Sequence, residues 1–348
     1  MNLTRISLLV FCFTLLFKSN VQAENQTEID SSFQVTAVVD SINTDTVAPK
    51  RSIFYRALHQ TRPITGLAFP LVYYTPETNL MFGAAGVISW RQNKDSTNSP
   101  SIVVPWFTYS VDNQIIAEAF GKFYFKGNQH ELSYELSFRK EKMPFYGIGN
   151  RLYEDKNNKE VIGMQRYRVN IGYQYRMKDI FLVGGIYDLD YVGKIEPELN
   201  KKMDTIDYYG QDGGFNHGIG VNLSFDNRDD VYFPYKGHYF DAKLIGYPNF
   251  LGSKYQFATL NAEYRSFINI KRKVVLASQI TSKMSFGDVP FYKMPALGGK
   301  QILRGFTHGT GRDNYLFNLQ GELRVPLNRF VIVGFFGSGI VGDEFMDY

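Results

Sequence analysis

The sequence predicts an all-β protein, a transmembrane antiparallel β-barrel, and three observations lead to this fold class. Hydrophobic residues make up 44% of the chain and aromatic residues 16%, yet the mean hydropathy is only −0.24. Beyond the N-terminal segment, apolar and polar residues alternate, and no stretch approaches the roughly 20 apolar residues of a membrane-spanning helix. Short and long connections also alternate, as they do in outer-membrane barrels. A secreted β-sandwich or carbohydrate-binding protein is the alternative that this composition leaves open.

The N-terminus has the features of a secretory signal. Arg5 precedes the apolar run 6–17, and Val21-Gln22-Ala23 places small residues before a cut after Ala23. The run is short for a membrane-spanning helix. We therefore expect residues 1–23 to be a cleaved signal peptide. Cys12, the single cysteine, would leave with it, so the mature chain would have no disulfide or thiol chemistry.

Residues 24–60 are predominantly polar and rich in Ser, Thr, Asn and Asp. Such a segment has too little apolar surface to fold by itself. We predict a short, mostly disordered periplasmic lead here, followed by an outer-membrane β-barrel over residues 61–348.

Thirteen alternating segments follow, bounded by turn residues. The alternation is clearest near residue 135, where Leu132, Leu136 and Phe138 share one face while Glu131 and Glu135 share the other. Long connections follow the fifth, seventh and eleventh segments. The strands are predicted at about 66–74, 80–91, 102–111, 114–125, 131–139, 166–176, 180–192, 219–225, 240–244, 256–270, 274–286, 315–325 and 330–341.

The period of two also assigns charged residues to the lumen. Arg166, Arg168, Arg176 and Arg324 are predicted to line it, and Glu322 shares the inner face of its strand with Arg324. Arg304 lies in the long loop before that strand, and an arginine inside a barrel needs a partner because an unpaired buried charge is costly. Glu322 is the partner we expect. In the alternative, Arg304 sits on a solvated loop and Glu322 pairs with Arg324 or a neighbouring strand.

Three stretches resemble motifs of the BamA/TamA-like outer-membrane assembly family, also called the bacterial surface antigen family. Leu303-Arg304-Gly305-Phe306, after Leu297-Gly298-Gly299 and before Arg312-Asp313-Asn314, resembles its L-R-G-F/Y loop. The segment 318–327 resembles the following strand, which ends in E-L-R-x-P-L. The family's D-x-R-D…P-x-x-G turn is matched by Asp226, Arg228, Asp229, Pro234 and Gly237.

The resemblance implies a place for these motifs. In the family, the loop after the eleventh strand folds back into the lumen, where its arginine meets acidic residues of the wall. A lumen-directed loop is therefore expected at residues 288–313, with Leu303, Arg304, Gly305 and Phe306 as its motif and Glu322 as its anchoring partner. The D-x-R-D turn is expected at the periplasmic end.

The chain departs from the family pattern in two places, and its lead is short. Gly337 stands where the family's F-x-D-x-G has its aspartate, so Arg304 would depend on Glu322. The family barrel has sixteen strands, whereas thirteen are readable before Tyr348; we expect about three strands to be missing by truncation, the alternative being a smaller closed barrel with a different strand count. The lead is too short for the polypeptide-transport-associated domains of assembly members, so the resemblance covers the barrel only.

No enzyme motif stands out. The five His show no H-x-H or H-E-x-x-H spacing, and G-x-S-x-G is absent. Tight packing at the wall explains Gly337-Ser338-Gly339 better than a nucleophile does. Asp226, Asp229 and Asp230 lack the ligand register of a calcium loop, so a solvated turn is favoured. We expect a protein that is not an enzyme and has no metal site and no cofactor.

The formal charge of +4 is too small to argue for a nucleic-acid partner. The expected partner is outer-membrane lipid, and the resemblance adds unfolded outer-membrane proteins or an assembly complex, with localisation in the bacterial outer membrane.

The implied function is insertion or translocation of outer-membrane proteins. The alternative is a channel or structural barrel with a loop-plugged lumen and no insertase activity. A lipid hydrolase would need a Ser/His pair at one barrel height, and none is visible. The sequence identifies no client or solute.

Overall fold

The computed structural model describes residues 10–16, 64–75, 78–91, 99–149, 159–199, 208–230, 233–271, 274–299, 301–327 and 330–344. The predicted lead at 24–60 and the expected cleavage point after Ala23 lie outside these residues. Part of the expected signal segment, Val10–Leu16, forms strand β1 and pairs antiparallel with β17.

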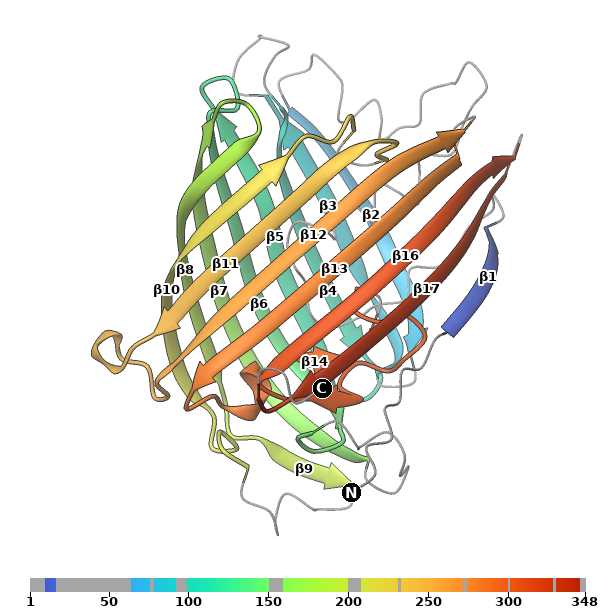
Figure 1. Ribbon diagram of the computed structural model, residues 1–348. Coiled ribbons are helices and arrows are strands. Elements are labelled where there is room, and N and C mark those ends of the chain that lie inside the picture. The colour runs from blue at the N-terminus through green and yellow to red at the C-terminus, as the bar shows by residue number, and fades with distance from the viewer. Residues whose placement is uncertain are drawn as a thin grey trace.

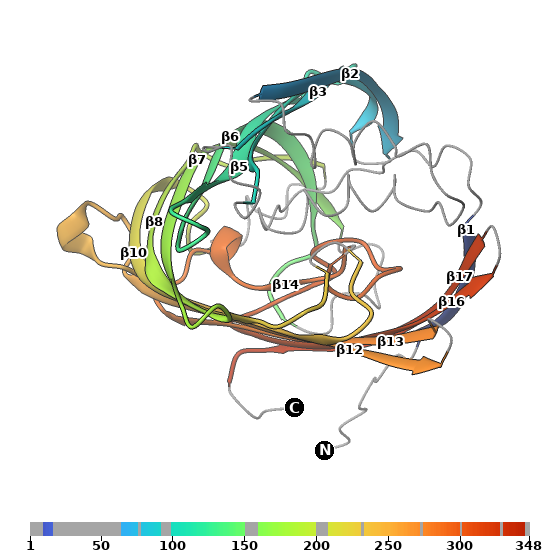
Figure 2. The ribbon, with the colours of Figure 1, turned by 90° about the horizontal axis from the view of Figure 1, so that it is seen from above.

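Long antiparallel strands form one sheet of 15 strands that curves around an interior (Figures 1 and 2). Its order is β1-β17-β16-β13-β12-β11-β10-β8-β7-β6-β5-β4-β3-β2, and β9 pairs with β7 outside this order. The remaining strands are β2 (Ile64–Thr75), β3 (Asn79–Trp90), β4 (Ser101–Ser110), β5 (Ile115–Phe125), β6 (His130–Phe145), β7 (Glu160–Met177), β8 (Phe181–Val192), β9 (Glu196–Leu199), β10 (Gly214–Asp226), β11 (Gly237–Tyr247), β12 (Phe257–Lys271), β13 (Val274–Gly287), β16 (Tyr315–Leu327) and β17 (Phe330–Gly342).

The predicted fold class, an all-β antiparallel barrel sheet, is confirmed. Each of the thirteen predicted strands has its counterpart among β2 to β8, β10 to β13, β16 and β17. The largest difference lies in the β6–β7 hairpin, which continues to Pro144↔Val161 and Phe145↔Glu160, where a loop was expected. The added pairs persist because Phe145, Ile162 and Met164 are buried in an apolar cluster beyond the predicted strand ends.

The two faces of the sheet differ as the period of two requires. On β10, Ile219, Val221 and Leu223 are more than half exposed on the outer face, whereas Asn216 and Asn222 are buried on the inner face. The same division holds on β16, where Phe317 and Leu319 lie outside. The sheet therefore presents an apolar band outward and polar side chains to its interior.

The interior also contains an apolar plug at the end where the long connections emerge. Its buried members include Ile162, Val192, Tyr247, Phe257 and Phe291, which come from four strands and from the 288–314 connection. Tyr247 stacks on Phe257 with ring centroids 4.2 Å apart. This packing holds the 288–314 connection inside the sheet.

Helices are minor elements in the described part of the chain. They include the short 3-10 helices η3 (Asn249–Leu251) and η4 (Phe291–Lys293). Among the described residues, no helix is long and apolar enough to cross a membrane.

Candidate functional site in the lumen

The connection between β13 and β16 turns back into the space enclosed by the sheet. It contains η4, then β14 (Ala296–Leu297), and then β15 (Gly311–Arg312), which pairs with β14. Seen from above, β14 lies within the curve of the sheet (Figure 2). We call residues 288–314 the lumen loop.

The lumen loop has a hydrogen-bonded frame of its own. Gly309 N donates to Leu297 O at 2.8 Å, and Gly299 N donates to Phe306 O at 2.9 Å. The turn at Gly298 needs glycine, because its φ is 100° and a Cβ there would meet Thr307 O at 2.0 Å. The loop therefore keeps a defined shape between β14 and β15.

The structure brings Arg304 and Glu322 together at the wall formed by β16. Arg304 Nη1 donates to Glu322 Oε1, and Arg324 donates to the other oxygen, Oε2, from Nε at 3.0 Å and from Nη2 at 2.9 Å. The Arg304 guanidinium also lies 5.7 Å from the ring centroid of Phe335. Glu322 is thus shared by the loop arginine and a neighbour on its own strand, so both pairings considered from the sequence occur together.

Apolar packing occupies the wall next to this ion pair. Leu297 and Leu303 lie against two glycines of β17: a Cβ at Gly339 would be 2.6 Å from Leu297 Cδ1, and one at Gly337 would be 3.3 Å from Leu303 Cδ1. Leu316 and Val341 complete the contact. The glycine at position 337 therefore leaves room for a leucine of the lumen loop.

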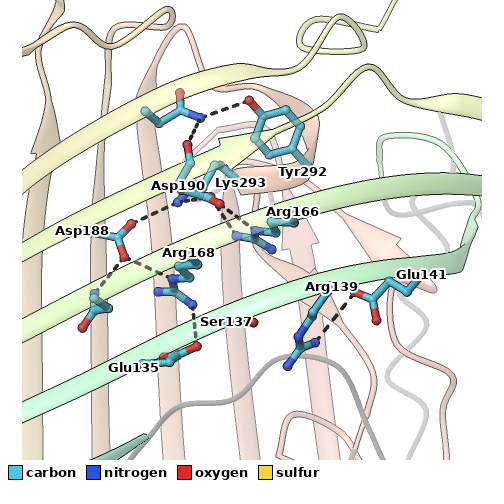
Figure 3. A network of polar contacts seen from close by, with 12 residues as sticks. Glu135, Ser137, Arg139, Glu141, Arg166, Arg168, Asp188, Asp190, Tyr292 and Lys293 are labelled. Carbon is cyan, nitrogen blue, oxygen red and sulfur yellow. Dashed lines mark hydrogen bonds and ion pairs between the residues drawn. The ribbon is translucent and has the colours of Figure 1, made fainter. Parts of the chain in front are cut away.

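A second charged contact of the lumen loop was missed from the sequence. Lys293, at the end of η4, places Nζ 2.6 Å from Asp190 Oδ2 and 3.2 Å from Asp188 Oδ2, both on β8 (Figure 3). The two aspartate side chains are fully buried and that of Lys293 is 8% exposed. The lumen loop is therefore held to the wall at two separate places.

The β7–β8 register explains how the two aspartates are compensated. Arg168 lies opposite Asp190 and Asn170 lies opposite Asp188. Arg166 donates to both oxygens of Asp190 at 2.9 Å. Asp188 accepts from Arg168 Nε at 3.1 Å and from Asn170 Nδ2 at 2.8 Å. Buried carboxylates persist where charge and hydrogen bonding are both matched, as they are here.

Two further groups complete this network. Tyr247 on β11 donates its hydroxyl proton to Asp188 Oδ2 at 2.7 Å, and Arg168 Nη1 lies 3.7 Å from Glu135 Oε1 on β6. On the same wall, Arg139 donates from Nε to Glu118 at 2.6 Å. Figure 3 shows Asp188, Arg168 and Glu135 joined by dashed lines, with Arg139 on the same wall. We call the group Arg166, Arg168, Asp188, Asp190, Tyr247 and Lys293 the β8 anchor.

The predicted lumen-lining arginines thus have three different surroundings. Arg166 and Arg168 belong to the β8 anchor, and Arg324 bonds Glu322. Arg176 lies at the end with short turns, where it donates to Asn128 O at 3.1 Å and Asp179 O at 2.9 Å. Near the end of β8, the even positions Asp188 and Asp190 face β7, whose Arg166 and Arg168 were predicted to point inward. This alternation was the signal from which the acidic partners of the two arginines could have been predicted.

The C-terminal limb of the lumen loop is tied to other backbone segments. Arg312 Nη1 donates to Phe291 O at 2.9 Å, and Gly149 N donates to Arg312 O at 2.7 Å. Next to it, Asn314 N donates to Asp313 Oδ1 at 2.9 Å. Burial raises the pKa of the Asp313 carboxyl, and the negative charge of nearby Asp343 raises it further. The hydrogen bond from Asn314 N lowers this pKa but does not cancel the increase. This limb therefore joins the lumen loop to the connection after β6.

The predicted turn motif forms the β10–β11 connection. Arg228 makes two hydrogen bonds to Asp226, at 2.9 and 2.8 Å, and its guanidinium carbon lies 4.6 Å from the Tyr239 ring centroid. Asp229 Oδ1 accepts the backbone N–H groups of residues 235 and 236 at 3.0 and 3.1 Å. Pro234 is buried, and Gly237 has a φ of 112°. The motif residues close one turn and lie outside the lumen site.

The lumen site consists of charge pairs and hydrogen bonds that hold the lumen loop against the wall. Its carboxylates are bonded to guanidinium, ammonium, amide or hydroxyl groups. Among the residues that the structure describes, no group of three His, Cys, Asp or Glu could hold a metal ion. The arrangement can hold a loop in one position and release it when the charge pairs separate.

Comparison with known proteins was made at the levels of family and fold. A model of the Omp85 superfamily domain matches residues 103–344. The structure of BamA from Haemophilus ducreyi lacking POTRA domains 1–3 is similar with a TM-score of 0.53 and 15% identity, over 80% of this chain and 58% of that chain. CdiB from Escherichia coli gives a TM-score of 0.49 and 10% identity, over 80% and 63% of the two chains. No curated protein matches. The chain thus spans less than two thirds of either solved structure.

Proposed function

Because the chain belongs to the Omp85 superfamily, we propose that it is an outer-membrane β-barrel that assists the insertion or translocation of other outer-membrane proteins. The observation that carries the proposal is the lumen loop, whose Arg304 bonds Glu322 on the inner wall. Because the loop lies in the lumen and is bonded to the barrel wall, a conformational change of the wall can move the loop and so change how the lumen is filled. The proposed partners are outer-membrane lipid and unfolded outer-membrane proteins or an assembly complex.

The proposed mechanism needs hydrogen bonding and no cofactor. Within the described residues, β2 forms a ladder on one side only, with β3. The free side of such a strand offers backbone N–H and C=O groups to an incoming strand. The lumen loop acts in this scheme by bracing the wall of β16 and β17, which lies toward the other end of the sheet.

An insertion assay tests the proposal. The protein is folded into lipid vesicles, and the rate at which an unfolded test barrel inserts is compared with the rate in empty vesicles. We expect acceleration, and we expect Arg304→Ala to reduce it several-fold because the loop loses its contact with Glu322. Equal insertion rates with and without the wild-type protein would contradict the proposal.

Two variants sharpen this assay. Arg304→Glu combined with Glu322→Arg restores one charge pair, and we expect partial recovery because Arg324 then faces an arginine in place of its carboxylate. Arg265→Ala is the matched control, since Arg265 bonds Glu263 on the same strand, β12. A loss with Arg265→Ala as large as that with Arg304→Ala would remove the special role of the loop.

A channel or structural barrel is the second candidate. The polar inner face with its charged groups favours it, because such an interior can pass solutes when the loop moves. Single-channel conductance without accelerated insertion would select this function over the first.

A further inference from the structure

Two short turns lie side by side at the end of the sheet opposite the lumen loop's entry. The β5–β6 turn (126–129) and the β7–β8 turn (178–180) adjoin because β6 pairs with β7, and Arg176 N donates to Gln129 O at 2.8 Å. Between them is a cleft with a volume of about 390 Å³. Its lining residues are Gly127, Gln129, Tyr175, Arg176, Met177, Lys178 and Asp179.

The cations of this cleft differ from those of the lumen. Arg176 is fixed by two backbone carbonyls, those of Asn128 and Asp179, and within the described chain no carboxylate contacts it or Lys178. Lys178 and Asp179 have φ of 48° and 59°, and this tight turn leaves both side chains exposed. The cleft therefore offers two cations and one carboxylate to a ligand from outside.

The outer face next to the cleft is aromatic and apolar. Tyr175, Met177 and Phe181 are 43%, 49% and 49% exposed. His130 Nδ1 lies 2.5 Å from the Tyr173 hydroxyl, and its ring lies 5.3 Å from that of Tyr175. Rings with an apolar body and a polar tip are typical of the level where acyl chains meet headgroups.

We propose that this cleft binds the headgroup of a phospholipid that carries a phosphate and a primary ammonium, as in phosphatidylethanolamine. The phosphate lies against Arg176 and Lys178, since guanidinium and ammonium groups are the usual phosphate ligands. The Asp179 carboxylate accepts hydrogen bonds from the lipid ammonium, and the acyl chains follow Tyr175 and Met177. The site rests on the proposed function only in that the barrel is embedded in the outer membrane, with its short turns on the periplasmic side.

The test is lipid retention by the folded protein. The barrel is folded into vesicles that contain equal amounts of phosphatidylethanolamine, phosphatidylcholine and phosphatidylglycerol, extracted in mild detergent, and examined by native mass spectrometry. We expect phosphatidylethanolamine to be retained above the other two, because a quaternary ammonium cannot donate to Asp179 and a glycerol headgroup has no cation. We expect Lys178→Gln to lower its retention on the order of fivefold.

Lys178→Gln is the main variant because the side chain of Lys178 makes no hydrogen bond or ion pair with the described residues, so its replacement should leave the turn intact. Lys236→Gln, at an exposed lysine of the β10–β11 turn, is the matched control. Asp179→Asn is expected to make retention of phosphatidylethanolamine and phosphatidylcholine equal. Equal retention of the three lipids by the wild type, or unchanged retention by Lys178→Gln, would overturn the site.

Retention is scored only on protein that shows the shifted gel migration of a folded barrel. The outcome is independent of the insertion assay. A protein that does not accelerate insertion of the test barrel can still retain the lipid, and a protein that accelerates insertion can fail to retain it.

Discussion

At the residue scale, the lumen shows how a barrel accommodates buried charge. Asp188 and Asp190 are fully buried, yet each bonds an arginine of β7 and lies within 3.2 Å of the Lys293 ammonium. Removing one member of such a group weakens the structure because the remaining charges stay in a medium of low dielectric constant. The position of the lumen loop therefore depends on individual side chains.

Lys293→Met keeps an unbranched side chain, one heavy atom shorter, and removes its charge. We expect it to destabilise the folded barrel by about 1–3 kcal/mol, since both aspartates retain other hydrogen bonds, and to expose the lumen loop. Urea unfolding in lipid and the rate of limited proteolysis within 288–313 measure the two effects.

The control for this variant is Lys283→Met, since Lys283 lies on the inner side of β13 with no carboxylate contact in the described structure. If Lys293→Met were as stable and as resistant to protease as Lys283→Met, the β8 anchor would have no role in holding the loop.

At this scale, a contact between residues near each other in the sequence could be predicted, and a contact between residues far apart in the sequence could not. Glu322 was identified as a partner for Arg304 because the two-residue period assigns it to the inner face. Lys293 was not paired with Asp188 and Asp190, since that contact depends on how far η4 descends into the lumen. The inner face of β7 was predicted to be basic, while the acids that balance it come from β8 and β6.

At the element scale, the lumen loop behaves as a small folded unit fitted into the wall. Its β14–β15 pairing and glycine turns set its shape, and Leu297 and Leu303 fill the space left by Gly339 and Gly337. Charge pairs hold it at Lys293 and Arg304, and apolar contacts pack it against β17. The fit to β17 depends on the absence of side chains there.

Gly339→Val should displace the lumen loop from β17, because a Cβ at this position would meet Leu297 Cδ1 at 2.6 Å. We expect a loss of about 1–3 kcal/mol from overpacking, and partial recovery when Leu297→Ala is added, which makes room for the new side chain. Thermal unfolding of the single and double variants measures both.

Gly246→Val is the control, since a Cβ at Gly246 on β11 would have no atom within 4 Å. If Leu297→Ala worsened the Gly339→Val variant by its full separate cost, the proposed contact between these two positions would be wrong.

The long strands could be predicted from the sequence because their two faces differ in polarity over many residues. β9, β14 and β15 could not, since strands of two to four residues carry too little alternation to recognise. The extension of β6 and β7 was missed because the residues beyond the predicted ends are buried by the apolar plug instead of following the polar inner pattern.

At the scale of the whole molecule, the sheet has an apolar exterior and a charged interior that the lumen loop partly fills. Releasing both of its charged contacts should open that interior to ions. We expect the double variant Lys293→Met, Arg304→Ala to conduct at least several-fold more than the wild type in single-channel recordings, and each single variant to give an intermediate conductance or brief openings.

The same recordings on Lys283→Met provide the baseline for an interior charge change that leaves the loop in place. A double variant that conducts like this baseline would show that the loop does not obstruct the lumen.

Glu322 bonds Arg324 as well as Arg304, so its charge stays compensated when the loop arginine leaves. Asp188 and Asp190 have no exposed surface, and departure of Lys293 would remove a cation from between them. The two charged contacts of the loop are therefore unequal. The contact at Arg304 can separate while Lys293 keeps its contacts, and the loop then stays attached to the wall at Lys293.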